Sequence, residues 1–225
     1  MYAIIFMMLG ICLLLLAYTE PRNEWLIVWM SANCWWVSLA YLLNRPGLLG
    51  KKTTGRMSAS ASIFLLPYYL LSWILWRLQT GLTREPKISQ VAPGLWIGGR
   101  VGLQQLPGGI VQVIDLAAEF PEIRHVVEST QYISIPVLDG ISPPVDSLVN
   151  VAEQFAKSTS PIYVHCALGH GRSATMAAGI LLLRGMAASV AEAELIICAA
   201  RPKIRLNRNQ KATLAIICTK RQNQK

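Results

Sequence analysis

The sequence predicts an α/β domain with a central, mainly parallel sheet flanked by helices, and two or three membrane helices before it. Three observations predict this arrangement. Long uncharged segments fill most of the first 76 residues, and apolar β-branched runs alternate with helical patterns after about residue 85. One of those runs leads into a short loop that contains glycines. Strands that alternate with helices are typical of folds with a buried parallel sheet.

Three apolar segments without a charged residue lie near the N-terminus, at 2–18, 25–44 and 57–76. Each has about the 17–25 residues that a helix needs to cross the hydrocarbon core of a bilayer. No basic region precedes the first segment and no clear cleavage site follows it, so a retained helix is favoured over a signal peptide. A core helix of a soluble protein is the alternative, and three such segments together disfavour it. We therefore predict a membrane region over 1–80.

Basic residues near the apolar segments indicate how the chain is oriented, because cytoplasmic loops are enriched in Lys and Arg. The loop between the first two segments has one basic residue, the next loop has four, and residues 77–87 have three. If the third segment enters and returns, or lies in the interface, both basic groups share one side. Pro67 permits such a break, although proline also occurs in spanning helices. We expect a multi-pass protein with a cytoplasmic domain, and whether the third segment spans stays open.

Composition limits the partners. The 225 residues carry a net charge of +9, and from Arg184 onward nine Lys or Arg face two Glu. In a chain with membrane helices, such a basic region favours anionic lipid over nucleic acid, while a solvated basic face explains it equally well. The five cysteines form no close-spaced pair, so neither a disulfide framework nor a metal site is expected. The sequence indicates no cofactor and defines no oligomeric state.

The domain predicted over 85–225 contains four β-branched or apolar runs and four helical patterns. We expect a turn and a short strand within 91–99, and strands at 111–118, 131–139 and 160–166. We expect helices at about 143–158, 171–185, 189–202 and 207–221. Gly185 closes the second helix, and Ser189 with Glu192 forms a capping pattern at the start of the third.

The loop HCALGHGRS, residues 165–173, joins a buried strand to a helix and holds a thiol and a guanidinium. Ligands of α/β sheets bind at the carboxyl ends of strands, where a helix N-terminus offers free N–H groups and a positive dipole end. Glycines let consecutive amides turn inward around an anion. Arg172 adds a planar fork for two phosphate oxygens, and the same positive field favours the thiolate of Cys166. The pattern predicts attack by Cys166 on a bound phosphate.

Such an attack needs a proton for the departing alkoxide. Asp139 ends the strand at 131–139 and precedes a glycine and a Pro-Pro pair, so it is the best candidate for the acid. Asp115, also at a strand end, is the second. A turn or capping aspartate is the structural alternative for Asp139.

The roles expected for the other polar residues of the loop follow from their positions in the sequence. His165 is expected to hydrogen-bond the loop from within the core, and the sequence assigns His170 no role. Ser173 could hydrogen-bond the thiolate and assist breakdown of a phosphocysteine.

The motif HCALGHGRSAT resembles the signature H-C-x5-R-S/T of the dual-specificity branch of the cysteine-based protein tyrosine phosphatases. The similarity extends over about residues 90–215, and VLDG lies where that family keeps its general acid. The resemblance implies a cysteine phosphatase fold, with Cys166 as nucleophile, Arg172 as phosphate clamp and Asp139 as acid. It implies a phosphate cradle formed by the amides of Ala167, Leu168, Gly169, His170, Gly171 and Arg172.

The stretch YVHCALGHGRSATMAAGILL is also similar to the phosphatidylglycerophosphate phosphatases of that branch, and membrane-anchored bacterial proteins of this type are familiar. This chain carries Ala167 and His170 where that branch often has a basic residue and a serine or arginine, so the resemblance leaves the substrate open between a phospholipid phosphate and a phosphoprotein. A silent phosphate-binding module is disfavoured by the intact Cys, Arg and Asp. A reductase or sulfur-transfer enzyme of the C-x5-R type would need further thiols close by, and Cys198 is expected in the core.

Overall fold

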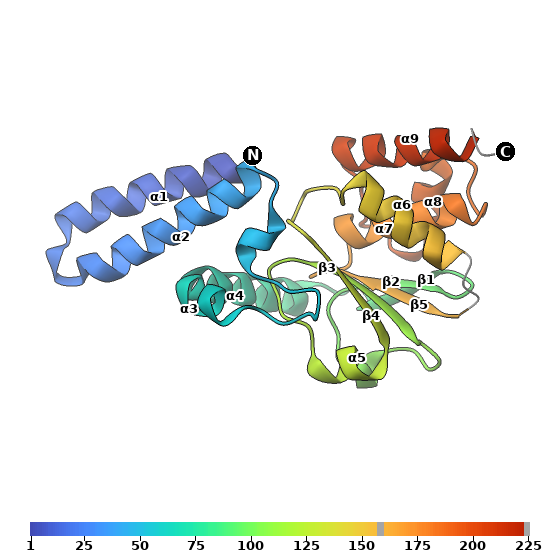
Figure 1. Ribbon diagram of the computed structural model, residues 1–225, viewed down its shortest axis with the longest axis horizontal. Coiled ribbons are helices and arrows are strands. Elements are labelled where there is room, and N and C mark those ends of the chain that lie inside the picture. The colour runs from blue at the N-terminus through green and yellow to red at the C-terminus, as the bar shows by residue number, and fades with distance from the viewer. Residues whose placement is uncertain (157–159, 223–225) are drawn as a thin grey trace. The chain divides into compact units, whose positions relative to one another are not determined.

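The computed structural model describes residues 1–156 and 160–222 (Figure 1). The chain forms two compact units. The first unit comprises Met1–Lys52, Arg56–Leu82 and Ala118–Pro121. The second unit comprises Thr53–Gly55, Thr83–Ala117 and Glu122–Lys225. The domain boundary at about residue 85 stays a prediction.

The first unit contains two helices that are long and apolar enough to cross a membrane, α1 (Tyr2–Thr19) and α2 (Glu24–Leu42). They pack closely: the hydroxyl of Ser31 in α2 donates a hydrogen bond to the carbonyl oxygen of Gly10 in α1 at 2.8 Å. A Cβ atom at Gly10 would lie 2.9 Å from the indole nitrogen of Trp35, so a larger residue would force the side chain of Trp35 to shift. Small residues and hydroxyl groups are typical contacts between membrane helices. The 3₁₀ helices η1 (Pro21–Asn23) and η2 (Pro46–Leu49) follow α1 and α2, respectively.

The third apolar segment forms two helices, α3 (Ala59–Phe64) and α4 (Leu66–Leu82), separated by one residue. At the break, the carbonyl oxygen of Phe64 accepts hydrogen bonds from the indole N–H of Trp29 at 2.8 Å and from Nδ2 of Asn33 at 2.9 Å. An interrupted helix at membrane depth is tolerated where the protein satisfies the freed backbone groups. The two donors from α2 therefore explain how the interruption is accommodated.

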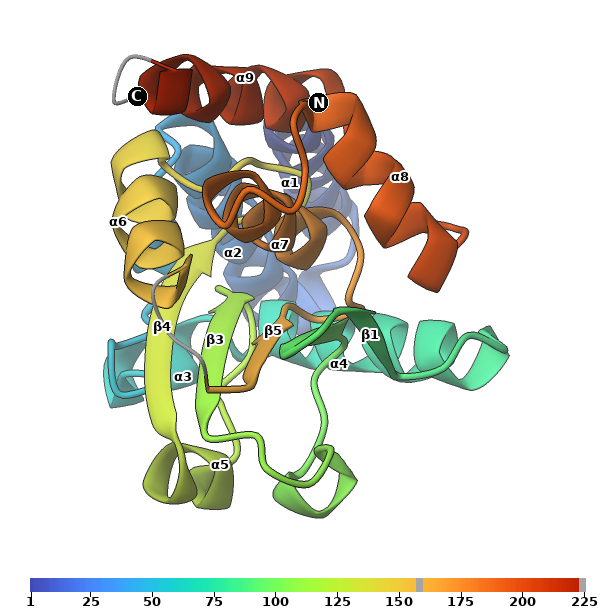
Figure 2. The same ribbon diagram turned by 90° about the vertical axis from the view of Figure 1, so that its right-hand side faces the viewer.

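The second unit is built on a five-stranded sheet with the order β1-β2-β5-β3-β4. Its strands are β1 (Ile88–Ala92), β2 (Leu95–Gly98), β3 (Gln112–Ala117), β4 (Gln131–Val137) and β5 (Ile162–His165). Within the described sheet, the β1–β2 pair is antiparallel, and β2, β5, β3 and β4 run parallel. Strands β4, β3 and β5 lie side by side in Figure 2. The predicted α/β class with a mainly parallel sheet is confirmed.

The turn and the short strand predicted at 91–99 are the turn and the second strand of a hairpin, whose first strand was not predicted. Its first arm is β1 and its second arm is β2, and the turn between them contains Gly94 with φ +72°. Glycine adopts this left-handed conformation without steric cost. The Pro-Gly turn signal was visible in the sequence, but the strand before it is polar enough to escape an apolar pattern.

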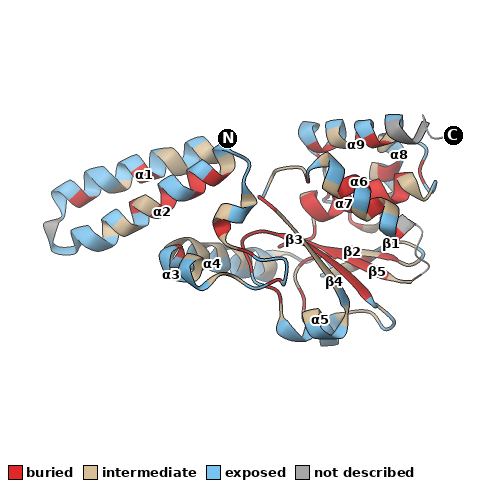
Figure 3. Cartoon of the chain, in the orientation of Figure 1, coloured by how far each residue is buried: buried red, intermediate tan, exposed pale blue. Residues whose placement is uncertain are grey.

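Helices α6 to α9 cover one face of the sheet (Figures 1 and 2). The helices of this unit are α5 (Arg124–Ser129), α6 (Val145–Ala156), α7 (Gly171–Leu183), α8 (Val190–Ala200) and α9 (Arg208–Gln222), with the 3₁₀ helix η3 (Leu103–Gln105). α7 is buried along most of its length (Figure 3), and it packs on β2 and β5. The short α5 was not predicted. Residues 157–158, the end of the helix predicted at about 143–158, lie outside the described part of the chain.

The parallel strands end at one edge of the sheet, which brings their loops together. In the register, Asp115 of β3 pairs with His165 of β5, and Gly98 of β2 pairs with the same histidine on the other side. The next residue after β5 is Cys166. Ligands of α/β sheets bind at this edge.

Candidate active site

The loop between β5 and α7 surrounds the sulfur of Cys166. The backbone N–H of Gly169 donates a hydrogen bond to Sγ at 3.3 Å, and Oγ of Ser173 lies 3.6 Å from it. The cysteine is 3 % exposed, so bulk water has little access to the thiol. Because α7 begins at Gly171, its free N–H groups and the positive end of its dipole lie at this loop. This arrangement suits a thiolate nucleophile beside an anion site.

Gly169 allows the loop to pass close to the neighbouring strand. Its φ is +79°, and a Cβ atom there would lie 2.3 Å from the carbonyl carbon of Gly98. Any other residue would have to displace the backbone of β2. The glycine therefore sets both the conformation of the loop and its position on the sheet.

The guanidinium of Arg172 is fixed from the ends of the strands. It is 2 % exposed, and its Nη1 donates a hydrogen bond to the carbonyl oxygen of Val137, the last residue of β4, at 2.9 Å. Its Nη2 lies 3.1 Å from Oδ1 of Asp139. A guanidinium held in this way has little freedom left to lose when it binds an oxyanion.

Asp139 lies in an exposed loop that α9 holds in place. Its side chain is 60 % exposed, and the residue after it, Gly140, has φ +72°. Nδ2 of Asn207 donates a hydrogen bond to the carbonyl oxygen of Gly140 at 3.0 Å. Asn207 and Gln210 also cap the start of α9 through reciprocal side-chain to backbone bonds. Sequence reasoning missed Asn207, whose signal was the capping pattern N-x-x-Q before a helix.

His165 lies behind Cys166 in a buried network. Its Nε2 is 3.0 Å from Oε2 of Glu122, its Nδ1 is 3.4 Å from the carbonyl oxygen of Cys166, and its ring stacks on Tyr163. Both ring nitrogens face acceptor oxygens, so the ring can donate a hydrogen bond to the network from whichever nitrogen carries the proton. The supporting role expected for His165 stays a prediction. Glu122 was not identified from the sequence.

Asp115, the second candidate for the acid, has no exposed surface. Its Oδ1 accepts a hydrogen bond from the backbone N–H of Ala117, and its Oδ2 accepts one from the hydroxyl of Tyr132 at 2.6 Å. Burial, together with the charge of Asp115 and this hydrogen bond, raises the pKa of Tyr132, so the hydroxyl stays a donor. A fully buried carboxylate that already accepts these bonds is a poor proton donor to a substrate.

Among the described residues, one group of three has the side-chain types that bind metals: Asp115, Glu122 and His165, with ligand atoms within 4.8 Å of one another. Tyr132 donates to Asp115, the backbone N–H of Ile123 donates to Glu122, and His165 faces Glu122. These contacts engage ligand atoms of all three residues, and Oε2 of Glu122 keeps the contact with His165 but accepts no hydrogen bond from the described residues. The cluster therefore has a structural explanation as a hydrogen-bonded network behind the cysteine.

His170, which the sequence left without a role, is held by an acidic residue outside the motif. Its Nε2 lies 2.7 Å from Oε2 of Glu85 and its side chain is 35 % exposed. Nη2 of Arg201 lies 3.7 Å from the same carboxylate oxygen. Arg201 is buried and so does not belong to the basic face expected in the region from Arg184 onward. Neither Glu85 nor Arg201 was identified as part of the site from the sequence.

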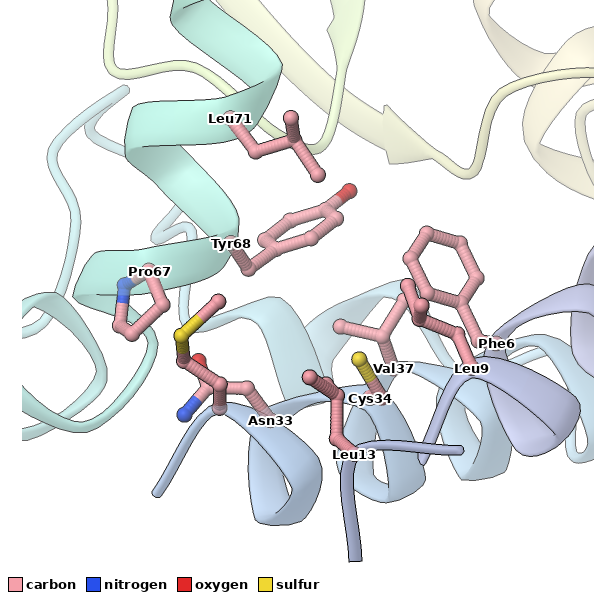
Figure 4. A pocket seen from close by; sticks show the side chains of 10 residues that line it. Phe6, Leu9, Leu13, Asn33, Cys34, Val37, Pro67, Tyr68 and Leu71 are labelled. Atoms are coloured by element: carbon pink, nitrogen blue, oxygen red, sulfur yellow. The ribbon is translucent and has the colours of Figure 1, made fainter. Parts of the chain in front are cut away.

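The first unit holds a separate cavity of about 170 Å³ between α1, α2 and α4 (Figure 4). Phe6, Val37 and Tyr68 are among the residues that line it, and Asn33 is the one amide in the lining. It contains no charged side chain that could bind a phosphate. The cavity therefore does not compete with the loop at Cys166 as a site for phosphoryl chemistry.

Residues 103–219 match the family model of the dual specificity phosphatase catalytic domain, slightly more than half of the 225-residue chain. The chain belongs to the dual specificity phosphatases. It is a cysteine-dependent phosphoric monoester hydrolase, and phosphorylated molecules are its substrates. A comparison with curated protein sequences found no match.

Solved structures of phosphatases share the fold of the second unit. PTPMT1 in complex with PI(5)P is 20% identical, with a TM-score of 0.55, and the match covers 62% of this chain and 99% of that chain. Human DUSP28 is 20% identical, with a TM-score of 0.53 and coverage of 61% and 99%. A mouse putative dual specificity phosphatase complexed with zinc tungstate is 24% identical, with a TM-score of 0.54 and coverage of 63% and 93%. At these identities the likeness shows the fold alone.

Proposed function

We propose that this dual specificity phosphatase is anchored in a membrane and removes the phosphate from a phospholipid phosphomonoester. The observation that carries the proposal is the pair of long apolar helices, α1 and α2, in the same chain as the phosphatase domain. Only residues 83–87 separate the end of α4 from the first strand, and fully extended they reach about 17 Å. A tether this short raises the local concentration of substrates in the same membrane. A structural neighbour, PTPMT1, was solved with a phosphoinositide.

In the proposed reaction, Sγ of Cys166 attacks the phosphorus and the bond from phosphorus to the leaving oxygen breaks. Asp139 gives its proton to that oxygen, and the product is a lipid hydroxyl and a phosphocysteine. Arg172 and the backbone N–H groups of 167–172 bind the other phosphate oxygens throughout. Water then attacks the phosphorus and gives its proton to the Asp139 carboxylate, which restores the acid. The thiolate of Cys166 leaves, and the hydroxyl of Ser173, 3.6 Å away, stabilises it.

The interruption between α3 and α4 supports a cytoplasmic phosphatase domain. An entering and returning third segment would place the four basic residues before it and the three after it on one side, against one basic residue in the first loop. Such an asymmetry favours the cytoplasmic side for the more basic loops. Exposed Lys203, Arg205 and Arg208 would then face anionic headgroups, each contributing about 1 kcal/mol at the surface.

The test measures phosphate release by the full-length protein in phosphatidylcholine vesicles. The substrate is a lipid phosphomonoester in the same vesicles, the same lipid in separate vesicles, or a soluble phosphopeptide. We expect the fastest phosphate release with the lipid in the same vesicles. Diluting that lipid with phosphatidylcholine at constant bulk concentration should slow release, because the encounter occurs within the bilayer. Metal-free buffer serves throughout.

A clear preference for the phosphopeptide would replace the lipid substrate by a phosphoprotein and leave the anchored phosphatase standing. Phosphate binding without turnover of any substrate would indicate a silent phosphate-binding module. Equal rates on lipid in the same and in separate vesicles would remove the proposed function of the membrane anchor.

A further inference from the structure

The segment that follows the apolar helices lies against the loop that surrounds Cys166. Glu85 belongs to this segment, and its side chain is 10 % exposed. Its carboxylate lies 2.7 Å from Nε2 of His170, in the loop, and 3.7 Å from Nη2 of Arg201, which follows α8. Glu85 therefore joins three parts of the second unit that are distant in the sequence.

Arg201 contacts both the segment and the loop. It is 3 % exposed, its Nη1 donates a hydrogen bond to the carbonyl oxygen of Pro86 at 2.6 Å, and its Nη2 donates one to the carbonyl oxygen of Leu168 at 3.3 Å. One buried guanidinium thus fixes the backbone after Glu85 to the backbone of the loop. A planar fork with several fixed donors suits this kind of bridging.

The main chain adds further links between the same regions. The N–H of Gly99 donates to the carbonyl oxygen of Lys87 at 3.0 Å, and the N–H of Arg100 donates to the carbonyl oxygen of Ala167 at 3.1 Å. The backbone at 167 and 168 and the side chain at 170 therefore all have partners in, or bonded to, residues 85–100. The conformation of the loop depends on these residues as well as on its own glycines.

The carboxylate of Glu85 is ionised in this environment. Burial by itself would raise the pKa of Glu85, but the hydrogen bond and charge of His170, with the charges of Arg201 and Lys203, lower it overall. A negative charge this close to an anion site repels a bound phosphate. Its contribution to phosphate binding must therefore come from the geometry that it imposes and not from its charge.

We propose that Glu85 is a positioning residue of the phosphate-binding loop, which it holds through His170 and Arg201. The segment between the apolar helices and the domain is thereby part of the site that binds the phosphate. The inference rests on the proposed role of the backbone N–H groups of 167–172 as the phosphate cradle, and not on the identity of the substrate.

Two variants of the full-length protein separate positioning from electrostatics. Glu85→Gln keeps the length of the side chain and removes the charge, while Glu85→Asp keeps the charge and shortens the reach. Positioning predicts weaker binding of orthovanadate, a phosphate analogue, and a higher KM for p-nitrophenyl phosphate in both variants, by about tenfold for the loss of a charge-assisted hydrogen bond. Electrostatics alone predicts tighter binding in Glu85→Gln and no change in Glu85→Asp.

Glu128→Gln is the matched control, because its carboxylate pairs with Arg124 in an exposed i,i+4 contact at 2.6 Å on α5. It should leave vanadate binding and KM unchanged. Thermal unfolding identifies any Glu85 variant that fails to fold, and Arg201→Lys then serves as the second probe, since it keeps the charge and loses the fork to Pro86 and Leu168. Folded Glu85 variants with wild-type or tighter vanadate binding, or an unaffected Arg201→Lys, would overturn the proposal.

Failure of the proposed function gives a different result from failure of this inference. A wild-type protein that neither hydrolyses p-nitrophenyl phosphate nor binds vanadate would refute the phosphatase mechanism itself. An active wild-type protein with unaffected Glu85 variants would refute only the positioning role.

Discussion

The loop at Cys166 has an aspartate on each of two sides, and the surroundings of the two differ. We call the side of Asp139 and Arg172 the front of the loop, and the side of Asp115, Tyr132 and His165 the back. In front, Asp139 is 60 % exposed and has a cationic partner, Arg172, at 3.1 Å. Behind, Asp115 is fully buried and accepts hydrogen bonds from Tyr132 and from the backbone. Asp115 lies near the carboxyl end of β3, and Asp139 lies just beyond the carboxyl end of β4, so their positions in the sequence look alike.

The difference teaches that burial and partners decide the role of a carboxylate at a strand end. An exposed carboxylate that solvent and substrate can reach can exchange a proton with the substrate. A buried carboxylate with its acceptors filled cannot, and losing one of its donors leaves it unsatisfied. Changes in front should therefore affect turnover, and changes behind should affect stability.

The largest expected effect is that of Cys166→Ser at the front. A serine hydroxyl stays protonated at neutral pH, so turnover should be abolished while inorganic phosphate still binds. Steady-state kinetics and isothermal titration with phosphate measure the two properties. A variant that kept more than about a hundredth of the wild-type rate would point instead to general acid–base effects of ~10²–10⁴.

Asp139→Asn should lower kcat on an alkyl phosphate by about 10²–10³, because the departing alkoxide then has no proton donor. The loss should be smaller on p-nitrophenyl phosphate, whose leaving group departs with little protonation. Steady-state kcat values of the variant and the wild type on both substrates test this prediction. Equal losses of kcat on both substrates would assign the acid role to another residue. The difference in role between the exposed Asp139 and the buried Asp115 would then lose its support.

Tyr132→Phe tests the back of the loop. It removes the hydroxyl that donates to Asp115 and leaves a buried carboxylate oxygen without that donor, so the free energy of unfolding should fall by about 1–3 kcal/mol. Any loss of kcat should be the same on alkyl and p-nitrophenyl phosphates. Denaturant unfolding and the two rates measure this. A loss that depended on the leaving group would give the buried network a part in proton transfer.

The fold class and the phosphatase chemistry of the loop at Cys166 could be predicted from the sequence, because both depend on local patterns. The β-branched runs marked the parallel strands, and the helix patterns marked α6 to α9. The family match confirms the phosphatase chemistry expected from HCALGHGRS. The individual roles of Cys166, Arg172 and Asp139 stay predictions.

The residues that support the loop could not be predicted, since they come from distant parts of the chain. Glu85 and Arg201 are 116 positions apart, and neither lies in a recognisable motif. Arg201 was grouped with a basic surface because its sequence neighbours are basic, and only the fold shows that it is buried. Glu122 and Tyr132 likewise meet His165 and Asp115 through strand pairing and a loop, which no local pattern encodes.

The smallest expected effect is the pH dependence of stability that Glu85 contributes. Since the pKa of Glu85 is lower in the folded protein than its usual value of about 4.3, this contribution is complete above about pH 4.5 and is lost as the pH falls through the folded value. The groups that face it, His170, Arg201 and Lys203, are all basic. The difference in Tm between wild type and Glu85→Gln should therefore be constant from pH 6 to pH 5 and shrink toward pH 3. Thermal unfolding of the detergent-solubilised protein across this range measures it. A difference that stayed constant down to pH 3 would show that the carboxylate is not stabilised by these cations, and would remove the link between the segment after α4 and the loop at Cys166.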